Sequence, residues 1–464
     1  MSDSSPRTRY RRLAVELAHR PLSDGLPEAP YLAARVAFTD VADGLGITRP
    51  ALYKLWPSQY EFWIDLSRYI AYEVDYSQPD HAMPWNARYV DAPPPPPQTR
   101  LTDHEIDRVV ATQANTVQDI VLADTWVLIR AASLGYPDVD DLGRIRQQVE
   151  TRRLDLLDAD IASSLPVLGR SAQAHIRRDL VASIWSIADG LSVLNRFIPD
   201  CARRVDVDFG HGTQSWTMLA LAVRSLYFGF SHPASPGSST HPSAPIVIAD
   251  IEAPAQPWSD LQLAALEVAA KLFVDSITDS TSIGDGPNVL RHVTVARLAT
   301  LAGVSRRTIY NVWPTRAEMM SGLLDDLLEQ GRAAQRAVFD ATTGRGLGEV
   351  TNALVGPPGV AVPVEPVSAF LIELGDDLHR ATIATSYRQR IADFVERLDA
   401  HLSSTHRRPR PGIELHDLGL LWLCLAEGGR RLRRVSPEKT VMFDVAAETV
   451  VHELTVDDVT APDR

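Results

Sequence analysis

Apolar residues recur at every third or fourth position over long stretches of this chain, which is the spacing of amphipathic α-helices. The longest such stripe comprises Ile176, Leu180, Ile184, Ile187, Leu191, Leu194 and Ile198. The next comprises Trp216, Leu219, Ala220, Val223, Leu226, Tyr227 and Phe230. Two more stripes lie in residues 412–433 and 438–454, and almost nothing alternates with the period of a strand. The pattern predicts an all-α protein.

Proline-rich segments divide the chain, which at 464 residues is too long for one hydrophobic core. Residues 231–257 hold six prolines and five serines, and this composition predicts an extended linker. Residues 77–100 hold seven prolines, which exclude a helix and favour a polyproline II spacer. The expected units between these segments are residues 1–76, 101–230, 258–317 and 318–464.

One sequence pattern occurs in both halves, near the start of each. Residues 36–63 and 293–320 align without a gap, 257 residues apart, and are identical at eight of 28 positions. The identical pairs are Val36/Val293, Ala42/Ala299, Gly46/Gly303, Arg49/Arg306, Tyr53/Tyr310, Trp56/Trp313, Pro57/Pro314 and Glu61/Glu318. We call these segments the first repeat and the second repeat. Each predicts two short helices joined at the shared glycine, because a left-handed turn residue is most easily glycine.

The second repeat has the chemistry of a segment that reads DNA. Ser305 is a favourable N-cap for a helix over residues 306–312, in which Ile309 and Val312 face inward. Arginine, asparagine and threonine recognise base edges or phosphates when such a helix enters the major groove. Residues 287–317 contain five arginines and no acidic residue, although the whole chain carries a net charge of −13. The candidate DNA-binding residues here are Ser305, Arg306, Arg307, Thr308, Tyr310, Asn311 and Arg316.

The first repeat has the same skeleton with weaker chemistry, because Asp40 and Asp43 cancel Arg49 and Lys54. Thr48 is expected to cap the second helix, and Pro50 is compatible with its first turn. The candidate DNA-binding residues here are Thr39, Thr48, Arg49, Tyr53 and Lys54. A copy kept for packing rather than for DNA contact is the alternative for this half.

Several classes of protein are disfavoured by the remaining features. The first residues lack the apolar core of a secretory signal, and no apolar stretch is long enough to span a bilayer. Cys201 and Cys424 are the only cysteines, which indicates a reducing cytoplasm. The histidines show no metal-binding spacing and no nucleophile–base set is present, so we expect neither a cofactor nor an enzyme.

Both repeats resemble the DNA-binding domain of the tetracycline-repressor-like (TetR) transcription regulators. The second repeat matches the family pattern at Ala299, Ala302, Gly303, Val304, Ser305, Ile309, Tyr310 and Arg316. The first matches at Thr39, Ala42, Gly46, Ile47, Thr48, Leu52 and Tyr53. The chain departs from the pattern at Trp56 and Trp313, where the family has Phe, and at Gln59, where a basic residue is usual.

The resemblance implies two DNA-binding domains, each followed by a helical body that binds a small molecule. Family members pair their last two helices in a homodimer, so this chain is expected to be a single-chain pseudo-dimer that pairs residues 176–198 and 213–230 with 412–433 and 438–454. Because the reading helices differ, double-stranded DNA with an asymmetric operator is the expected partner. The candidate ligand-binding residues are Trp126, Trp185, Phe197, Trp216, Phe370, His379, Tyr387 and Trp422, each of which is also an ordinary core residue.

Three functions therefore compete. The leading one is a ligand-responsive transcription regulator, most simply a repressor. The second is a helical protein-interaction module in which one or both repeats no longer bind DNA. The third is a helical enzyme, which the lack of a catalytic constellation disfavours.

Overall fold

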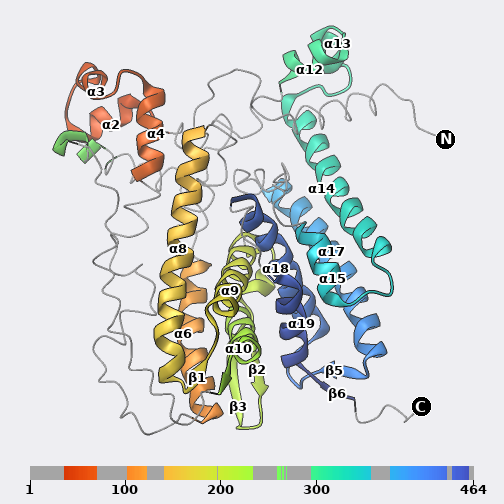
Figure 1. Cartoon of the computed structure of the whole chain (residues 1–464). Helices are drawn as coiled ribbons and strands as arrows, with labels where there is room; N and C mark the ends of the chain where they lie inside the picture. The colour runs from red at the N-terminus through yellow and green to blue at the C-terminus, as the bar shows by residue number, and fades with distance from the viewer. Residues whose placement is uncertain are drawn as a thin grey trace.

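The computed structural model describes residues 36–69, 102–122, 140–195, 197–233, 294–356, 377–435 and 442–458, together with 259–262, 264, 265 and 268. This part of the chain is mostly helical, as predicted (Figure 1). The spacer predicted at 77–100 and nearly all of the linker predicted at 231–257 lie outside it.

Two small helical heads lie at the same end of the molecule, on opposite sides (Figure 1). The first head, residues 36–69, contains α2 (Phe38–Leu45), α3 (Arg49–Leu55) and α4 (Gln59–Tyr69). The second head, residues 294–320, contains α12 (Val295–Ala302), α13 (Arg306–Tyr310) and the start of α14 (Arg316–Ala341). Helix α14 continues from this head into the body of the molecule (Figure 1).

The body is built from long helices of both halves. The first half contributes α6 (Asp103–Val121), α8 (Asp140–Val167), α9 (Ala174–Leu194), the 3-10 turn η3 (Pro199–Ala202) and α10 (Met218–Phe230). The second half contributes α15 (Leu347–Val355), α17 (Asp377–Ser404), α18 (Leu415–Val435) and α19 (Phe443–Glu453). No helix of the described residues combines the length and apolarity needed to cross a membrane.

The described residues also contain six short strands, whose positions the helical stripes did not predict. They form three antiparallel pairs: β1 (Arg170–Ser171) with β4 (His232–Pro233), β2 (Arg204–Asp208) with β3 (Thr213–Thr217), and β5 (Arg407–Pro409) with β6 (Thr455–Asp457). Strands of two to five residues are too short to produce a visible period in the sequence. Trp216 was assigned to a helical stripe, but it lies on β3. The helix of that stripe, α10, begins two residues later at Met218.

The four helices that carry the predicted stripes pack together at the centre of the body. Helix α9 packs along α18, and α10 packs along α19. Two glycines allow the backbones of α9 and α18 to approach closely: a Cβ on Gly190 would lie 2.3 Å from the carbonyl oxygen of Cys424, and one on Gly428 would lie 1.9 Å from that of Ser186. Any larger residue at either position therefore forces the two helices apart.

Buried ion pairs cross this central region. Arg431 of α18 lies 3.3 Å from a carboxylate oxygen of Asp189 on α9. One helix turn earlier, Glu427 accepts a hydrogen bond from Arg390 of α17. Burial opposes the ionisation of Glu427, but the guanidinium groups of Arg390, Arg430 and Arg431 outweigh it and lower its pKa to about 2. These charges are paired, as buried charges must be.

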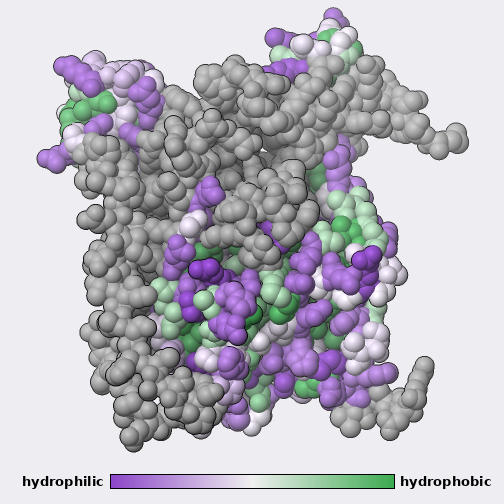
Figure 2. All heavy atoms as spheres, in the orientation of Figure 1, coloured by the Kyte–Doolittle hydropathy of each residue, from purple (hydrophilic) through white to green (hydrophobic). Residues whose placement is uncertain are grey.

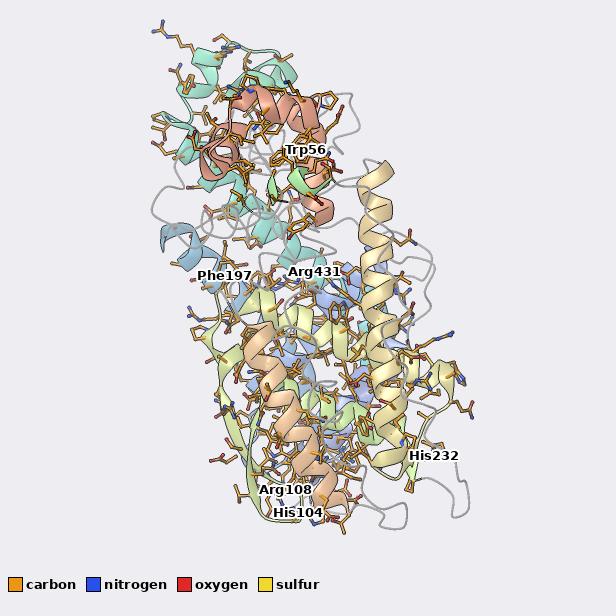
Figure 3. The ribbon with its side chains drawn as sticks, turned by 90° about the vertical axis from the view of Figure 1, so that its left-hand side faces the viewer. Trp56, His104, Arg108, Phe197, His232 and Arg431 are labelled. Carbon is orange, nitrogen blue, oxygen red and sulfur yellow. The ribbon has the colours of Figure 1, made fainter. Side chains whose placement is uncertain are left out.

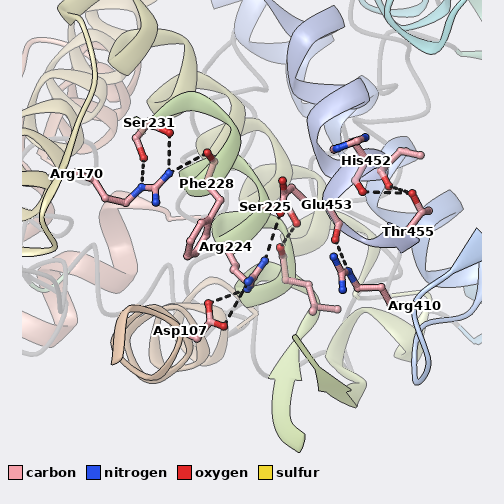
Figure 4. Close-up of polar contacts among 12 residues, drawn as sticks. Asp107, Arg170, Arg224, Ser225, Phe228, Ser231, Arg410, His452, Glu453 and Thr455 are labelled. Atoms are coloured by element: carbon pink, nitrogen blue, oxygen red, sulfur yellow. Dashed lines mark hydrogen bonds and ion pairs between the residues drawn. The ribbon is translucent and has the colours of Figure 1, made fainter. Parts of the chain in front are cut away.

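The two halves end in the same local structure, a short strand pair closed by an arginine. In the first half, the side chain of Arg170 donates to the hydroxyl and carbonyl oxygens of Ser231 and to the carbonyl of Phe228 (Figure 4). In the second, Arg407 donates to the hydroxyl and carbonyl oxygens of Thr455 and to the carbonyl of His452. Each arginine thus fixes the last helix of its half to the strand that precedes the helix pair.

Candidate nucleic-acid interface

The second repeat folds into two short helices joined by a tight turn. Thr294 caps α12 by accepting a hydrogen bond from the backbone nitrogen of Arg297 at 3.1 Å. Gly303 ends α12 with φ 67° and ψ 34°, the left-handed conformation predicted for it. Ser305 then caps α13, since its hydroxyl accepts from the backbone nitrogen of Thr308 at 3.2 Å. Sequence reasoning missed Thr294, although threonine directly before an apolar helix is an N-cap signal.

Helix α13 is anchored by its apolar side and exposes its polar side. Ile309 and Trp313 are buried, at 0% and 2% exposure. The candidate reading residues are exposed, with Thr308 only partly so: Ser305, Arg306, Arg307, Tyr310 and Asn311. Thr315 caps α14 by accepting from the backbone nitrogen of Glu318. Arg316 is the first residue of α14, and its side chain lies outside the described part. The structure thus gathers two arginines and a tyrosine on α13, with an asparagine at its C-cap.

The first repeat has the same turn but different caps. Gly46 ends α2 with φ 66°. Thr48 occupies the N-cap position of α3, but its side chain accepts no hydrogen bond there, contrary to the prediction. Thr39 does not begin α2 either: the helix starts at Phe38 with Ala37 as its N-cap, which leaves Thr39 exposed inside the helix. The threonine of the family pattern therefore corresponds to Thr294 in the second repeat and to Ala37 in the first.

The polar side of α3 is also exposed, and it contains an internal contact. Arg49, Tyr53 and Lys54 are all exposed. The Arg49 side chain donates to the Tyr53 hydroxyl at 3.1 Å and lies over its ring, 5.6 Å from the ring centroid. Gln59, which stands where the family has a basic residue, donates to the carbonyl of Val36 at 3.5 Å. Helix α3 therefore presents two cations, one of which already has a side-chain partner.

An aromatic cluster forms the core of the first head. Phe38, Trp56 and Phe62 are nearly fully buried, and the Trp56 and Phe62 rings meet edge to face at 5.1 Å. The indole nitrogen of Trp56 donates to Asp65 at 2.8 Å. The indole of Trp56 is thus accommodated here by a carboxylate on α4. Hydrophilic residues cover much of the visible surface of both heads (Figure 2), and Figure 3 shows Trp56 at the end of the molecule opposite His232.

The candidate ligand-binding residues that the structure describes are all buried core residues. Trp185 donates to Glu150, and Trp422 donates to Thr351. Tyr387 is buried beside Arg390, whose guanidinium lies 5.0 Å from the ring centroid. Trp216 is buried on β3 against Phe209, and Phe197 is buried just after α9. Trp126, Phe370 and the His379 side chain lie outside the described residues.

The described residues contain no group of three or more histidine, cysteine or acidic side chains placed to hold a metal ion. Helix α13 carries two exposed arginines and no acidic residue, and it lies in a head at the end of the molecule (Figure 1). Comparison of the chain with protein-family models, with curated proteins and with solved structures finds no match.

Proposed function

We propose that this protein is a DNA-binding transcription regulator, in which α13 enters the major groove of a duplex. The observation that carries the proposal is the surface of α13. Arg306, Arg307 and Asn311 are exposed on a capped helix whose opposite side is anchored by Ile309 and Trp313. Arginine suits guanine, asparagine suits adenine, and a short helix with such residues near its N-terminus fits the groove. DNA binding by the first head would then use Arg49 and Lys54.

The packing of the body supports a single-chain pseudo-dimer. Gly190 of α9 meets Cys424 of α18, and Gly428 of α18 meets Ser186 of α9. On α9 the glycine lies four positions after Ser186, and on α18 it lies four positions after Cys424. Each helix therefore contributes an equivalent pair of positions to the contact. Such reciprocity is the signature of a two-fold interface. The matching arginine contacts of Arg170 and Arg407 extend the correspondence to the ends of both halves.

A small-molecule effector would act through α14 in this scheme. The helix has 26 residues, which correspond to a length of about 39 Å, and it joins the second head directly to the body. Deep in the body, Gln335 of α14 exchanges two hydrogen bonds with Arg390 of α17. Arg390 in turn contacts Glu427 on the central helix α18. A ligand that changes the packing of α17 and α18 would therefore shift α14 and the head that it carries.

The proposal is tested by selecting duplexes from a random pool and measuring binding by gel shift at two salt concentrations. We expect specific binding with a steep salt slope, because cationic side chains displace counterions from phosphates. The double variant Arg306→Ala/Arg307→Ala should abolish specific binding, whereas Arg49→Ala should weaken it less. The control is Arg336→Ala/Arg345→Ala, which removes two charges from α14 and the turn after it and should leave specific binding intact.

If no duplex is enriched over bulk competitor, the proposal is wrong. Equal losses in the α13 variant and in the control would also overturn it, since binding would then follow net charge alone. Retention of DNA specificity without α13 arginines would assign the reading surface elsewhere in the chain.

A further inference from the structure

A helix from the second half of the sequence packs on the first head. The described residues between Ser259 and Val268 are helical, and Ser259 and Gln262 cap the start of this helix reciprocally. We call the described residues of this stretch, 259–262, 264, 265 and 268, the crossing helix. In the chain it precedes the second repeat, but in space it lies beside α2 and α3 of the first head, where Figure 1 draws it in green.

Two contacts and the burial of a third residue establish this placement. The side-chain amide of Gln262 donates to the carbonyl of Leu55, the last residue of α3, at 3.4 Å. Ala265 is fully buried. A Cβ on Gly44 of α2 would lie 2.8 Å from Cγ1 of Val268, so Val268 lies directly on the helix surface that the glycine leaves bare. The crossing helix therefore touches both helices of the first repeat.

The crossing helix leaves the candidate reading surface of the first head free. Arg49, Tyr53 and Lys54 are exposed with the crossing helix in place. The free carbonyls at the end of a helix need partners, and Gln262 supplies one for α3. Packing on α2 and capping of α3 together fix the angle between these helices, on which the presentation of α3 to DNA depends.

We propose that Gln262, Ala265 and Val268 of the second half are positioning residues for DNA reading by the first head. The DNA part of this inference rests on the proposed function, while the packing part does not. The first head is then completed only in a chain that contains both halves. The orientation of the first head then depends on the second half through the crossing helix as well as through the central helices of the body.

A substitution cycle in the full chain tests the packing part. Glycine weakens a helix interior, so Gly44→Ala would strengthen α2 if nothing faced it. With Val268 in place, the new methyl group has no room, and hydrogen exchange of backbone amides in α2 and α3 should accelerate. In the Val268→Ala background the room is restored, so Gly44→Ala should slow exchange there. We expect the effects of Gly44→Ala in the two backgrounds to differ roughly threefold or more in exchange rate.

Leu261→Ala is the matched control, because Leu261 lies on the same helix but is 42% exposed. It should leave exchange in both heads unchanged, and amides of α12 and α13 should be unaffected by every variant of the cycle. If Gly44→Ala changes exchange in α2 equally in the two backgrounds, or if α12 and α13 respond as strongly as α2 and α3, the inference is wrong.

Footprinting on the selected duplex tests the reading part. Gly44→Ala should weaken protection of the half-site bound by the first head and spare the other half-site. Gly44→Ala/Val268→Ala should recover the lost protection. A cycle that behaves as expected in hydrogen exchange without any specific DNA binding would refute the proposed function and leave the crossing helix as a packing element. Protection lost equally at both half-sites would refute the positioning role.

Discussion

At the scale of single residues, Asp160 makes the stability of the protein depend on pH. Burial raises the pKa of this α8 carboxyl to about 7 from the ordinary 3.8. Between these values the unfolded chain has lost the proton and the folded chain retains it, so the free energy of unfolding falls as pH rises. This loss in the free energy of unfolding is absent at about pH 4 and complete above about pH 7.

Replacing Asp160 with Asn removes this titration. We expect Asp160→Asn to raise the thermal midpoint at about pH 8 and to change it little at about pH 4. Thermal melts across this range measure the difference, and Asp155→Asn, at an exposed position of the same helix, should show no such trend. A gain of equal size at both pH values would show that the carboxylate charge is not responsible.

Cys201 and Cys424 are both fully buried, although they come from different halves. Burial raises the pKa of the Cys424 thiol, and a hydrogen bond with Cys201 that favours the protonated form of Cys424 raises it further. Since only the thiolate reacts, neither cysteine should react with a chromogenic thiol reagent in the native protein. Both should react after denaturation, and Ser305→Cys, at an exposed position before α13, should add one thiol that reacts at once. Rapid reaction of Cys201 or Cys424 in the native protein would contradict their burial.

At the scale of elements, the crossing of α9 and α18 is the most sensitive contact of the body. Gly428→Ala places a methyl group against the backbone of Ser186 rather than against a flexible side chain. We expect the free energy of unfolding to fall by about 1–3 kcal/mol, the usual cost of overpacking, as measured by denaturant titration. Gly346→Ala is the control, because its Cβ would meet only the Glu448 carboxylate at 3.4 Å. Equal stability of the two variants would contradict the close crossing.

The elements that sequence reasoning found are those with local signals. The turns at Gly46 and Gly303 were predicted because a tight turn after an apolar helix needs a left-handed residue, and both glycines have positive φ. The four central helices were predicted because their stripes span several turns. The β2–β3 hairpin was missed, although Asp208 and the glycines at 210 and 212 are a turn signal. Trp216 was assigned to a helix because its three-residue spacing from Leu219 continues the stripe of α10.

Other features have no local signal, because they depend on contacts between distant parts of the chain. Nothing in residues 259–268 indicates that Val268 packs on Gly44, more than 200 positions earlier. The ion pair of Asp189 with Arg431 is equally non-local, since neither residue constrains the other until α9 and α18 have paired. In the candidate site, the exposure of Arg306 and Arg307 followed from the helical period, but the missing cap at Thr48 depends on how α3 begins.

At the scale of the whole molecule, the proposed pseudo-dimer predicts that one chain is the functional unit. The pairing of α9 and α10 with α18 and α19 is satisfied within the chain, so these surfaces are not free for a second copy. We expect a particle of 51.1 kDa in solution and one chain per selected duplex, as measured by light scattering and native mass spectrometry. A dimer of chains that persists on dilution would argue that the two halves of one chain do not form the complete regulator.

The difference between the two reading helices predicts an operator without two-fold symmetry, and exchanging their chemistry should change that symmetry. The exposed positions of α3 become those of α13 in the variant Pro50→Arg/Ala51→Thr/Lys54→Asn, while the buried Leu52 is kept. Because two-fold related heads with the same chemistry read the same bases on opposite strands, this variant should prefer a palindrome of the half-site bound by the second head, with centres separated by about one DNA turn. Gel shifts on the original duplex and on the palindrome measure the preference, which should be reversed relative to the unchanged chain. Should the variant keep the original asymmetric preference, α3 would not read bases, and the first head would serve packing rather than recognition.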